Sequence, residues 1–409
     1  MGAIFALEQP LRFASNVLLA RLLYPEALGL IALSFSFLVG LQLISDLGIR
    51  VALIQHADAD QRRFQDTAWT LQVIRGLVLG GFGCLLAWPA AYWRETPEPQ
   101  LLWLMPLLGS TALIEGFICT KLPLLQRHMQ QTRVAVFEFV CGFVGNVVMI
   151  AGAWYYPSPI SLVAGPITTS SLKLLGSFFL SKGPINRWCW DRESLRSLSG
   201  ISRWTLIATA CAFFAGHTDK LVLGLQSISR LGVYHIGVQL AQIPVSLMSS
   251  LSYRLVFPYY SRAAREGTLH QTYRRTQTLC DWLASCLAVG VAVTGSTVVQ
   301  LAYDARYADA GWIVRLIAVG VWFQIIAWNA NALMIAQGYH STPAFSNFGK
   351  VLVLAVGIPL GTWLDGLRGM IIAVALGDVA FYVVNQIIVT RRGFWLLRTD
   401  FRWTLFSAG

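Results

Sequence analysis

The composition of this 409-residue chain is that of a membrane protein. It is 56% hydrophobic and only 12% charged, with a mean hydropathy of +0.58, whereas a soluble domain carries about 25% charged residues. The net charge of +11 would suggest nucleic-acid binding in a soluble protein, but here the Lys and Arg residues lie in short loops between apolar segments. Such basic loops orient membrane helices, so no nucleic-acid partner is predicted.

Twelve apolar segments, each about the length of a bilayer-spanning helix, follow one another along the chain. They lie near residues 1–23, 28–49, 67–93, 101–120, 134–156, 160–181, 203–226, 231–253, 279–302, 312–336, 345–363 and 368–390. These segments predict an all-α integral membrane protein with about twelve transmembrane helices. Residues 391–409 follow the last segment as a cytoplasmic tail.

The basic residues between these segments alternate between two sides. Of the 31 Lys and Arg residues, 21 fall in one set of alternate gaps or in the tail, five fall in the other set, and five lie inside the segments. Lys350 is counted in the first set. Because cytoplasmic loops carry the excess of basic residues in membrane proteins, both termini are predicted to be cytoplasmic.

An internal repeat relates the two halves of the chain. Residues 18–32 resemble residues 221–236 when Gly29 is aligned with Gly232, an offset of 203 residues. In both copies a short turn joins the first apolar segment of the half to the second. An even number of segments in each half keeps the two copies in the same orientation, which indicates parallel repeats.

The repeat predicts two parallel six-helix lobes of the MATE-like kind, formed by residues 1–181 and 203–390. A cytoplasmic connector over 182–202 would join them. This connector carries Trp188 and Trp190 among basic residues. It is interpreted either as a short amphipathic segment at the membrane surface or as a plain linker.

The sequence offers no catalytic, metal or cofactor site. Its seven cysteines are scattered, form no Cys-x-x-Cys pair and have no His nearby at ligand spacing, so they are interpreted as small packing residues. It contains no Gly-rich phosphate loop with Lys, no HExxH and no nucleophile elbow. We therefore predict a protein that is not an enzyme, holds no cofactor or metal, and does not pump with ATP by itself.

The charged residues deepest in the apolar segments are the functional candidates. Each costs roughly 2.5 to 3.5 kcal/mol at the bilayer centre, so each needs a partner or a water-filled cavity. They are Arg12, Arg75, Lys173, Lys220, Glu8, Asp219 and Asp378. Glu8 precedes Arg12 by four residues, the spacing of an intrahelical ion pair. Arg75 and Lys173 have no opposite charge in their own segments, which makes them the better candidates for binding an anionic ligand. Pairing with a charge on another helix is the equally weighted alternative.

Five short segments carry a resemblance to a known family. They are Gly2–Gln9 (GAIFALEQ), Leu19–Gly29 (LARLLYPEALG), Ser45–Gly48 (SDLG), Asp66–Trp69 (DTAW) with Arg75 and Gly76, and Asp219–Gly224 (DKLVLG) followed by Leu231, Gly232 and Tyr234. In order and spacing they resemble bacterial polysaccharide flippases of the Wzx type, which transport O-antigen and exopolysaccharide units. The superfamily of these flippases also contains the multidrug and toxin extruders (MATE) and the lipid II flippases.

The resemblance covers nearly the whole chain. Because the chain ends soon after its twelfth segment, it resembles the twelve-helix polysaccharide branch rather than the fourteen-helix lipid II flippases. Relatives often begin with a longer cytoplasmic lead, which leaves open whether this N-terminus is complete.

The resemblance implies a flippase of the bacterial inner membrane. Such a protein moves a lipid-linked oligosaccharide repeat unit, usually on undecaprenyl pyrophosphate, by alternating access during the biosynthesis of surface lipopolysaccharide or exopolysaccharide. Its implied partners are that lipid-linked oligosaccharide, membrane lipids, and the polysaccharide polymerase and chain-length machinery.

A diphosphate in a low-dielectric cavity requires cations, and Arg can bind it in a bidentate manner. The predicted pyrophosphate ligands are, in falling order, Arg75, Lys220, Arg12 and Lys173. Asp219 and Asp378 are the deep carboxylates available for coupling to an ion gradient. Trp69, Trp204 and Tyr234 are candidate sugar contacts.

Two other classes of membrane protein are alternatives to a polysaccharide flippase. A drug or metabolite extruder of the same superfamily would have an acidic lumen for organic cations, which the deep cations disfavour. A membrane-embedded glycosyltransferase or polymerase would need a catalytic constellation and a large non-cytoplasmic loop, and the sequence contains neither.

Overall fold

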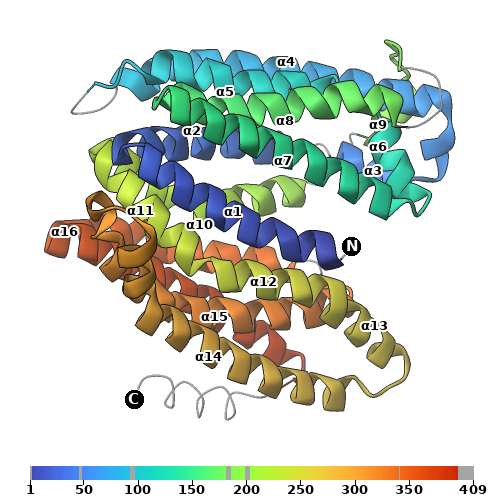
Figure 1. The fold of residues 1–409 in the computed structure, drawn as a ribbon. Coiled ribbons are helices and arrows are strands. Elements are labelled where there is room, and N and C mark those ends of the chain that lie inside the picture. Colours follow the sequence, from blue (N-terminus) through green and yellow to red (C-terminus); the bar gives the residue numbers. More distant parts are fainter. Residues whose placement is uncertain are drawn as a thin grey trace. The chain divides into compact units, whose positions relative to one another are not determined.

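The computed structural model describes residues 2–45, 48–92, 97–180, 186–198, 203–339 and 341–394. Every regular element within these ranges is a helix, so the all-α prediction is confirmed (Figure 1). The side chains of Glu8, the predicted partner of Arg12, and of Trp204 lie outside the described part, as do residues 395–409 of the predicted tail.

The helices pack into two compact units. The first comprises Met1–Leu206 with Leu223–Gly232, and the second comprises Ile207–Val222 with Val233–Gly409. The connector therefore belongs to the first unit. Two helices, α10 (Arg203–Gln226) and α11 (Ile228–Ala241), contribute residues to both units.

Nine of the described α-helices lie wholly within the first unit. They are α1 (Gly2–Leu22), α2 (Pro25–Ile44), α3 (Ile49–Gln55), α4 (Arg62–Tyr92), α5 (Leu101–Gly116), α6 (Lys121–Arg127), α7 (Gln131–Tyr155), α8 (Pro159–Phe179) and α9 (Arg192–Leu198). Helix α4 packs along α5, α7 packs along α8, and α2 contacts α4, α5 and α8. A Cβ atom on Gly76 would lie 2.9 Å from the carbonyl oxygen of Ala112, so this glycine permits the close packing of α4 and α5.

Two predicted spans of this unit are interrupted near one end. The segment 28–49 is predicted as one helix, but α2 ends at Ile44 and α3 begins at Ile49 because Gly48 takes a left-handed conformation with φ 61°. The segment 101–120 is also broken, and α5 and α6 meet at an angle of 58°. These breaks allow α3 and α6 to contact each other.

The second unit is organised around α15. Its further helices are α12 (Ile243–Leu251), α13 (Phe257–Arg265), α14 (Leu269–Ala302), α15 (Ala310–Ala336) and α16 (Thr342–Arg391), with a π-helical turn over Ser252–Val256 between α12 and α13. Helix α15 contacts α12, α13, α14 and α16. It is accordingly the most completely buried of these helices.

Helix α16 contains two predicted spans, 345–363 and 368–390, that fold back on each other. The helix breaks at Asp365 and Gly366, where Gly366 has a positive φ of 56°. Gly361 and Gly369 then meet so closely that a Cβ on either would clash with the backbone of the other. Small residues let the two helical arms approach in this way.

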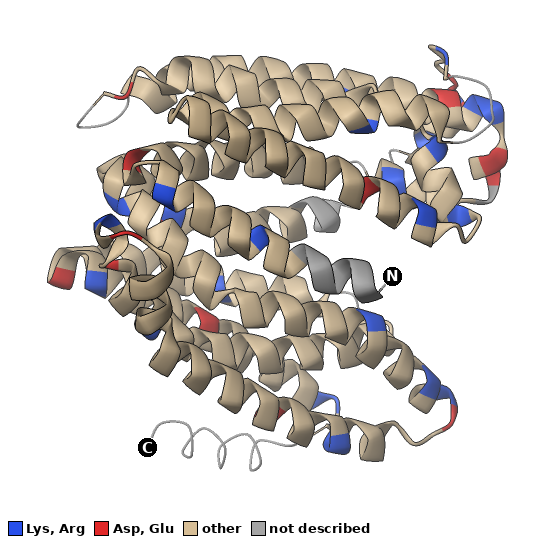
Figure 2. Ribbon diagram, viewed as in Figure 1, with Lys and Arg blue, Asp and Glu red and all other residues tan. Residues whose placement is uncertain are grey.

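Loops that the charge alternation assigns to one side lie together in the first unit. Arg127 of α6 forms an ion pair with Asp60 at 3.1 Å, and it donates to the carbonyl oxygens of Ile54 and His56 at 3.1 and 2.7 Å. Figure 2 shows that charged residues lie mostly at helix ends, with few in between. The two loops thus share a side, while the assignment of that side to the cytoplasm stays a prediction.

The described part of the connector docks on the first turns of α4. The Asp66 carboxylate accepts hydrogen bonds from Asn186 Nδ2 at 3.3 Å and from the backbone N–H of Arg187 at 3.1 Å. Two threonine hydroxyls of α4 accept from backbone N–H groups farther along the connector. Trp188 packs edge-on against Trp69, with ring centres 5.6 Å apart. Residues 186–198 are therefore a docked segment rather than a plain linker.

The internal repeat reappears as a reciprocal contact between α2 and α11. These helices begin at Pro25 and Ile228, which the offset of 203 residues relates. A Cβ on Gly29 would clash with the carbonyl oxygen of Ile228, and a Cβ on Gly232 would clash with that of Pro25. All four residues belong to the first unit.

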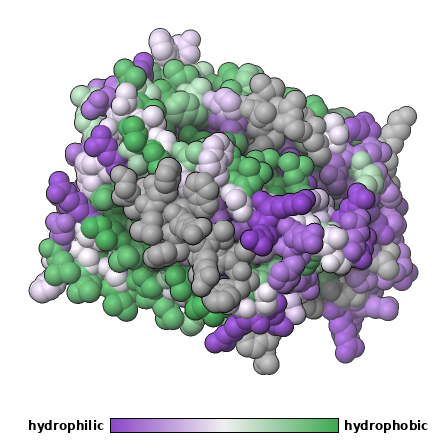
Figure 3. All heavy atoms as spheres, turned by 90° about the horizontal axis from the view of Figure 1, so that it is seen from below, coloured by the Kyte–Doolittle hydropathy of each residue, from purple (hydrophilic) through white to green (hydrophobic). Residues whose placement is uncertain are grey.

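Six of the described helices are long and apolar enough to cross a membrane. They span Pro25–Leu43, Arg62–Tyr92, Gln131–Tyr155, Leu269–Ala302, Ala310–Ala336 and Thr342–Arg391, and two bent pairs, Leu101–Gly116 with Lys121–Arg127 and Ile228–Ala241 with Ile243–Arg265, raise the count to eight. On the face in Figure 3 hydrophilic side chains gather mainly toward the right-hand end, and hydrophobic ones are more numerous to the left of them.

We expect Gly232→Ala to destabilise the protein by about 1–3 kcal/mol, because the new methyl group would press on the backbone of Pro25, which cannot rotate away. The measurement is the melting temperature of the purified protein in detergent. Gly81→Ala is the matched control, since this glycine of α4 has no atom within 4 Å of its Cβ position. Equal melting temperatures for the two variants would contradict the reciprocal contact.

Asp191 makes the first turn of α9 sensitive to acid. The hydroxyl and the backbone N–H of Ser194 donate to its carboxylate at 2.6 and 2.9 Å, and these bonds hold the pKa of Asp191 below its ordinary value. A lowered pKa in the folded state means that the stabilising effect is present at neutral pH and is lost as the pH falls through that pKa.

Amide hydrogen exchange of residues 192–198, corrected for the intrinsic rate, measures this effect. Wild-type protection should fall once the pH drops below about 4. In Asp191→Ala these amides should be less protected than in the wild type already at pH 7, and their protection should not fall further when the pH is lowered. Equal amide protection of residues 192–198 in Asp191→Ala and in the wild type at pH 7 would exclude this role for Asp191.

Candidate functional site

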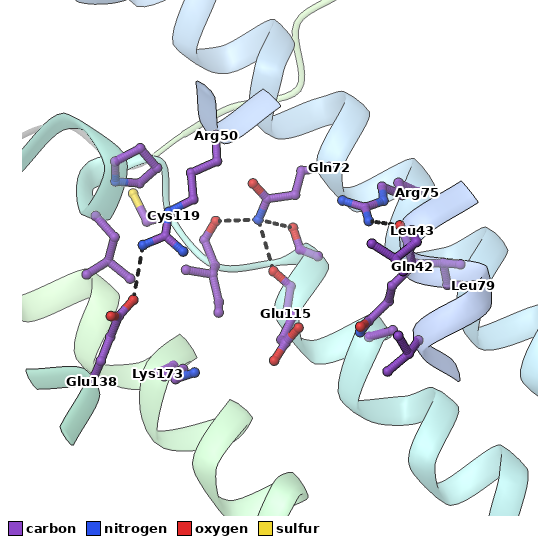
Figure 4. Close-up of a pocket in the computed structure, with 17 residues that line it drawn as sticks. Gln42, Leu43, Arg50, Gln72, Arg75, Leu79, Glu115, Cys119, Glu138 and Lys173 are labelled. Carbon is purple, nitrogen blue, oxygen red and sulfur yellow. Dashed lines mark hydrogen bonds and ion pairs between the residues drawn. The ribbon is translucent and has the colours of Figure 1, made fainter. Parts of the chain in front are cut away.

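A cavity of about 460 Å³ lies in the first unit and is lined by residues from helices α2 to α8 (Figure 4). Its charged lining residues are Arg50, Arg75, Lys173, Glu115 and Glu138. Gln42 and Gln72 add polar groups, and most of the remaining lining is apolar. Three cations face two carboxylates, so the described lining has a net positive charge.

Arg75 is held in place by the end of α2. Its Nη2 donates to the carbonyl oxygen of Gln42 at 2.7 Å, and its Nε donates to Ser45 Oγ at 3.0 Å. The last carbonyl groups of a helix lack intrahelical partners and form the negative end of its dipole, so a guanidinium group is stabilised there. These bonds fix the orientation of Arg75 at the cavity wall.

Lys173 of α8 and Glu115 of α5 point toward one another across the cavity in Figure 4. Glu115 accepts a hydrogen bond from Ser170 Oγ at 3.1 Å. Within the part of the chain that the structure describes, Lys173 makes no ion pair or hydrogen bond. A lysine placed in this way can bind an anion that enters the cavity.

Arg50 and Glu138 form an ion pair at 3.3 Å at the edge of the cavity, with side chains 59% and 39% exposed. An exposed pair of this kind contributes little to stability and exchanges readily with other partners. Arg50 is not among the predicted site residues, because the sequence places it in a loop between two apolar segments. The signal that could have found it is Gly48, which has a left-handed conformation and precedes α3.

The structure brings two of the four predicted pyrophosphate ligands, Arg75 and Lys173, to one cavity. Arg12 is exposed on α1 and is not among the lining residues. Lys220 belongs to the second unit, where its Nζ lies 3.4 Å from the carbonyl oxygen of Gly216 in its own helix. These two cations therefore contribute nothing to the described wall of this cavity.

The two predicted coupling carboxylates, Asp219 and Asp378, are both buried in the second unit. Tyr234 donates its hydroxyl hydrogen to Asp219 Oδ2 at 2.5 Å. Asp378 accepts from Lys350 Nζ at 2.6 Å and from Gln324 Nε2 at 2.8 Å. Each carboxylate thus has a specific donor, as a buried acid requires.

Lys350 is buried in a helical hairpin, so its predicted place in a cytoplasmic loop is wrong. It was counted with the cytoplasmic loops, but it lies more than two turns inside α16 and its side chain is only 15% exposed. Its partner Asp378 lies on the other arm of the same helical hairpin. The pairing depends on the fold-back at Gly366, which the spacing of the two residues along the chain does not reveal.

Two of the candidate sugar contacts have structural roles instead. Tyr234 is fully buried, and its hydroxyl group donates a hydrogen bond to Asp219. Trp69 donates its indole N–H to the carbonyl oxygen of Phe117 at 3.3 Å and packs against Trp188.

Removing one partner of the Lys350–Asp378 pair should be far more costly than removing both. We expect Lys350→Leu to lower the free energy of unfolding by about 3–5 kcal/mol, because it leaves a buried carboxylate without its cation. Lys350→Leu combined with Asp378→Leu should recover most of that loss. Melting temperatures of the two single variants and the double variant measure the coupling, and additive effects would contradict a direct pair.

A family model described as polysaccharide biosynthesis protein matches residues 18–312 of this chain. The succinoglycan biosynthesis transport protein ExoT of Rhizobium meliloti is 25% identical over 273 residues, which cover 66% of this chain. The matched part spans only 53% of the length of ExoT. The teichuronic acid biosynthesis protein TuaB of Bacillus subtilis is 19% identical over 364 residues, covering 87% of this chain and 72% of TuaB.

Solved structures with the same fold are transporters. The lipid II flippase MurJ in its inward closed conformation matches with a TM-score of 0.78 at 12% identity, over 100% of this chain and 90% of MurJ. An inward-facing multidrug resistance MATE family transporter of the MOP superfamily matches with a TM-score of 0.71 at 15% identity, over 97% and 95% of the two chains. At these identities the structures establish the fold alone.

ExoT, MurJ and the MATE protein are a transport protein, a flippase and a transporter rather than enzymes, in agreement with the prediction from the sequence. The apolar helices make the chain a multi-pass membrane protein. The family model covers well over half of the 409 residues. This chain belongs to the polysaccharide biosynthesis protein family and has the fold of the MOP superfamily transporters.

Proposed function

We propose that this protein is a flippase that moves an oligosaccharide repeat unit, linked to undecaprenyl pyrophosphate, across the bacterial inner membrane for surface polysaccharide biosynthesis. The observation that carries the proposal is a single cavity lined by Arg75, Lys173 and Arg50 in a chain of this family. A drug extruder for organic cations would not benefit from such a lining.

The cavity has the chemistry that a diphosphate needs. Arg75 would bind two phosphate oxygens with its planar guanidinium, whose orientation the end of α2 already fixes. Lys173 would act as a movable point charge. Arg50 could exchange Glu138 for phosphate, because exposed ion pairs are weak. The apolar lining strengthens each of these interactions by lowering the local dielectric constant.

The proposed topology has twelve crossings and cytoplasmic termini, as the basic loops favour. The cationic cavity lies near the end of the first unit where the basic residues Arg62, Lys121 and Arg127 lie. With that end in the cytoplasm, the cavity would receive the diphosphate headgroup from the inner leaflet. The lipid chain would stay in the membrane.

Transport would proceed by alternating access of two six-helix lobes, residues 1–181 and 203–390. Arg12 and Lys220 remain proposed phosphate ligands for other stages of the cycle. Asp219 and Asp378 are the proposed coupling acids: protonation of Asp378 would release Lys350 for an anion. The polysaccharide polymerase and chain-length machinery would receive the product.

The test is complementation of a bacterial strain whose own polysaccharide flippase gene is deleted. The wild-type chain should restore surface polysaccharide. Arg75→Ala and Lys173→Ala should each reduce it about tenfold or more, since each removes a charge-assisted bond to the cargo. The amount of surface polysaccharide per cell, normalised to membrane-inserted protein, is the readout.

Arg133→Ala is the matched control. Arg133 is an exposed basic residue of the same unit, bonded to Gln130 at 3.0 Å and outside the cavity lining. This variant should transport like the wild type. Full activity of both cavity variants would remove the site assignment, and failure of the wild-type chain with every lipid-linked cargo tried would remove the proposed function.

A further inference from the structure

A second hollow, of about 650 Å³, lies at the other end of the first unit. Its lining residues come from three connections that are far apart in the sequence. These are the α1–α2 turn, the segment before α5, and the α7–α8 turn, each with the start of the helix that follows. The lining residues Ala27 on α2 and Gln42 beside the cationic cavity are fifteen positions apart. At 1.5 Å per residue this places the two sites about 22 Å apart along α2.

The chemistry of this hollow is opposite to that of the cationic cavity. Its aromatic lining residues are Tyr24, Trp103 and Tyr156, and its acidic ones are Glu26 and Glu98. Gln100 and Ser158 add polar groups. Among the described residues that line it, none is basic. An anionic group such as a diphosphate would be repelled here.

Aromatic rings together with carboxylates suit an uncharged sugar. The ring face of Tyr or Trp is apolar and can cover the C–H face of a pyranose, while the polar tip stays in water. A carboxylate has two oxygens with about four acceptor sites, enough to accept from two neighbouring sugar hydroxyls. The volume lies within the range of small-molecule pockets, roughly 300 to 1,000 Å³.

We propose that this hollow binds an uncharged sugar residue of the cargo oligosaccharide on the side opposite the cationic cavity. The proposal rests on the proposed function for the identity of the cargo. Tyr156 and Tyr24, 66% and 59% exposed, supply accessible ring surface. Glu26 and Glu98 supply acceptors for hydroxyl groups, and Trp103 of α5 forms part of the wall.

The rings by themselves have a simpler explanation, since Tyr and Trp gather at membrane surfaces. That explanation does not account for two carboxylates placed beside the rings around one hollow. Tyr155 is 88% exposed and lies outside this lining. Tyr155 and Tyr156 are therefore a matched pair, one outside the hollow and one inside it.

Saturation-transfer NMR on the purified protein in lipid nanodiscs tests the proposal, with maltose, lactose and cellobiose as neutral probes and glucuronic acid as the charged one. We expect transfer to at least one neutral disaccharide and none to glucuronic acid. Tyr156→Ala and Glu98→Gln should weaken that binding about 5- to 10-fold, as loss of one stacked ring or one acceptor predicts. Tyr156→Phe and Tyr155→Ala should bind like the wild type.

The outcomes separate this site from the proposed function. Absence of transfer to every neutral probe, or equal transfer to Tyr156→Ala and the wild type, would overturn the sugar site even if complementation succeeds. Sugar binding with the expected variant pattern, in a protein that fails to complement, would support the site and count against the flippase. Melting temperatures of all variants verify that each is folded.

Discussion

A charged side chain within the membrane-spanning part of a protein needs a partner, a helix end or a cavity, because an unpaired charge in hydrocarbon is costly. This constraint governs the arrangement of both units. Lys350 and Asp378 pair across the arms of a hairpin, Asp219 bonds with Tyr234, and Arg75 binds the end of α2. Lys173 has no bonded partner within the described residues, but it faces a cavity.

The first unit separates two kinds of chemistry along the same helices. Cations and glutamates lie where the basic loops gather, and rings with carboxylates lie where the opposite turns meet. A lipid-linked oligosaccharide has a similar arrangement, with a diphosphate next to the lipid and sugars beyond it. One unit could therefore hold both parts of such a cargo, each by its own complementary groups.

Much of the fold could be predicted because a bilayer forces simple patterns on a sequence. The apolar segments predict the helices, and the alternation of basic residues predicts that Arg127 and the Asp60 loop share a side. The repeat predicts the equivalence of Gly29 and Gly232. The site was less predictable. Arg50 lines the cavity because the chain turns at Gly48 just before it, and Lys350 pairs with Asp378 because α16 folds back at Gly366. In the sequence each of these turns is marked only by one glycine, which is too little to predict the turn.

The most direct test of the account is native mass spectrometry of the purified protein with undecaprenyl pyrophosphate, undecaprenyl phosphate and undecaprenol. If Arg75 and Lys173 hold the headgroup, the protein should retain the diphosphate lipid best, the monophosphate less and the alcohol least. Replacing both residues by Ala should abolish this order while leaving the melting temperature of the protein within a few degrees of the wild type. Equal retention of all three lipids by the wild-type protein, or an unchanged order in the double variant, would contradict the account.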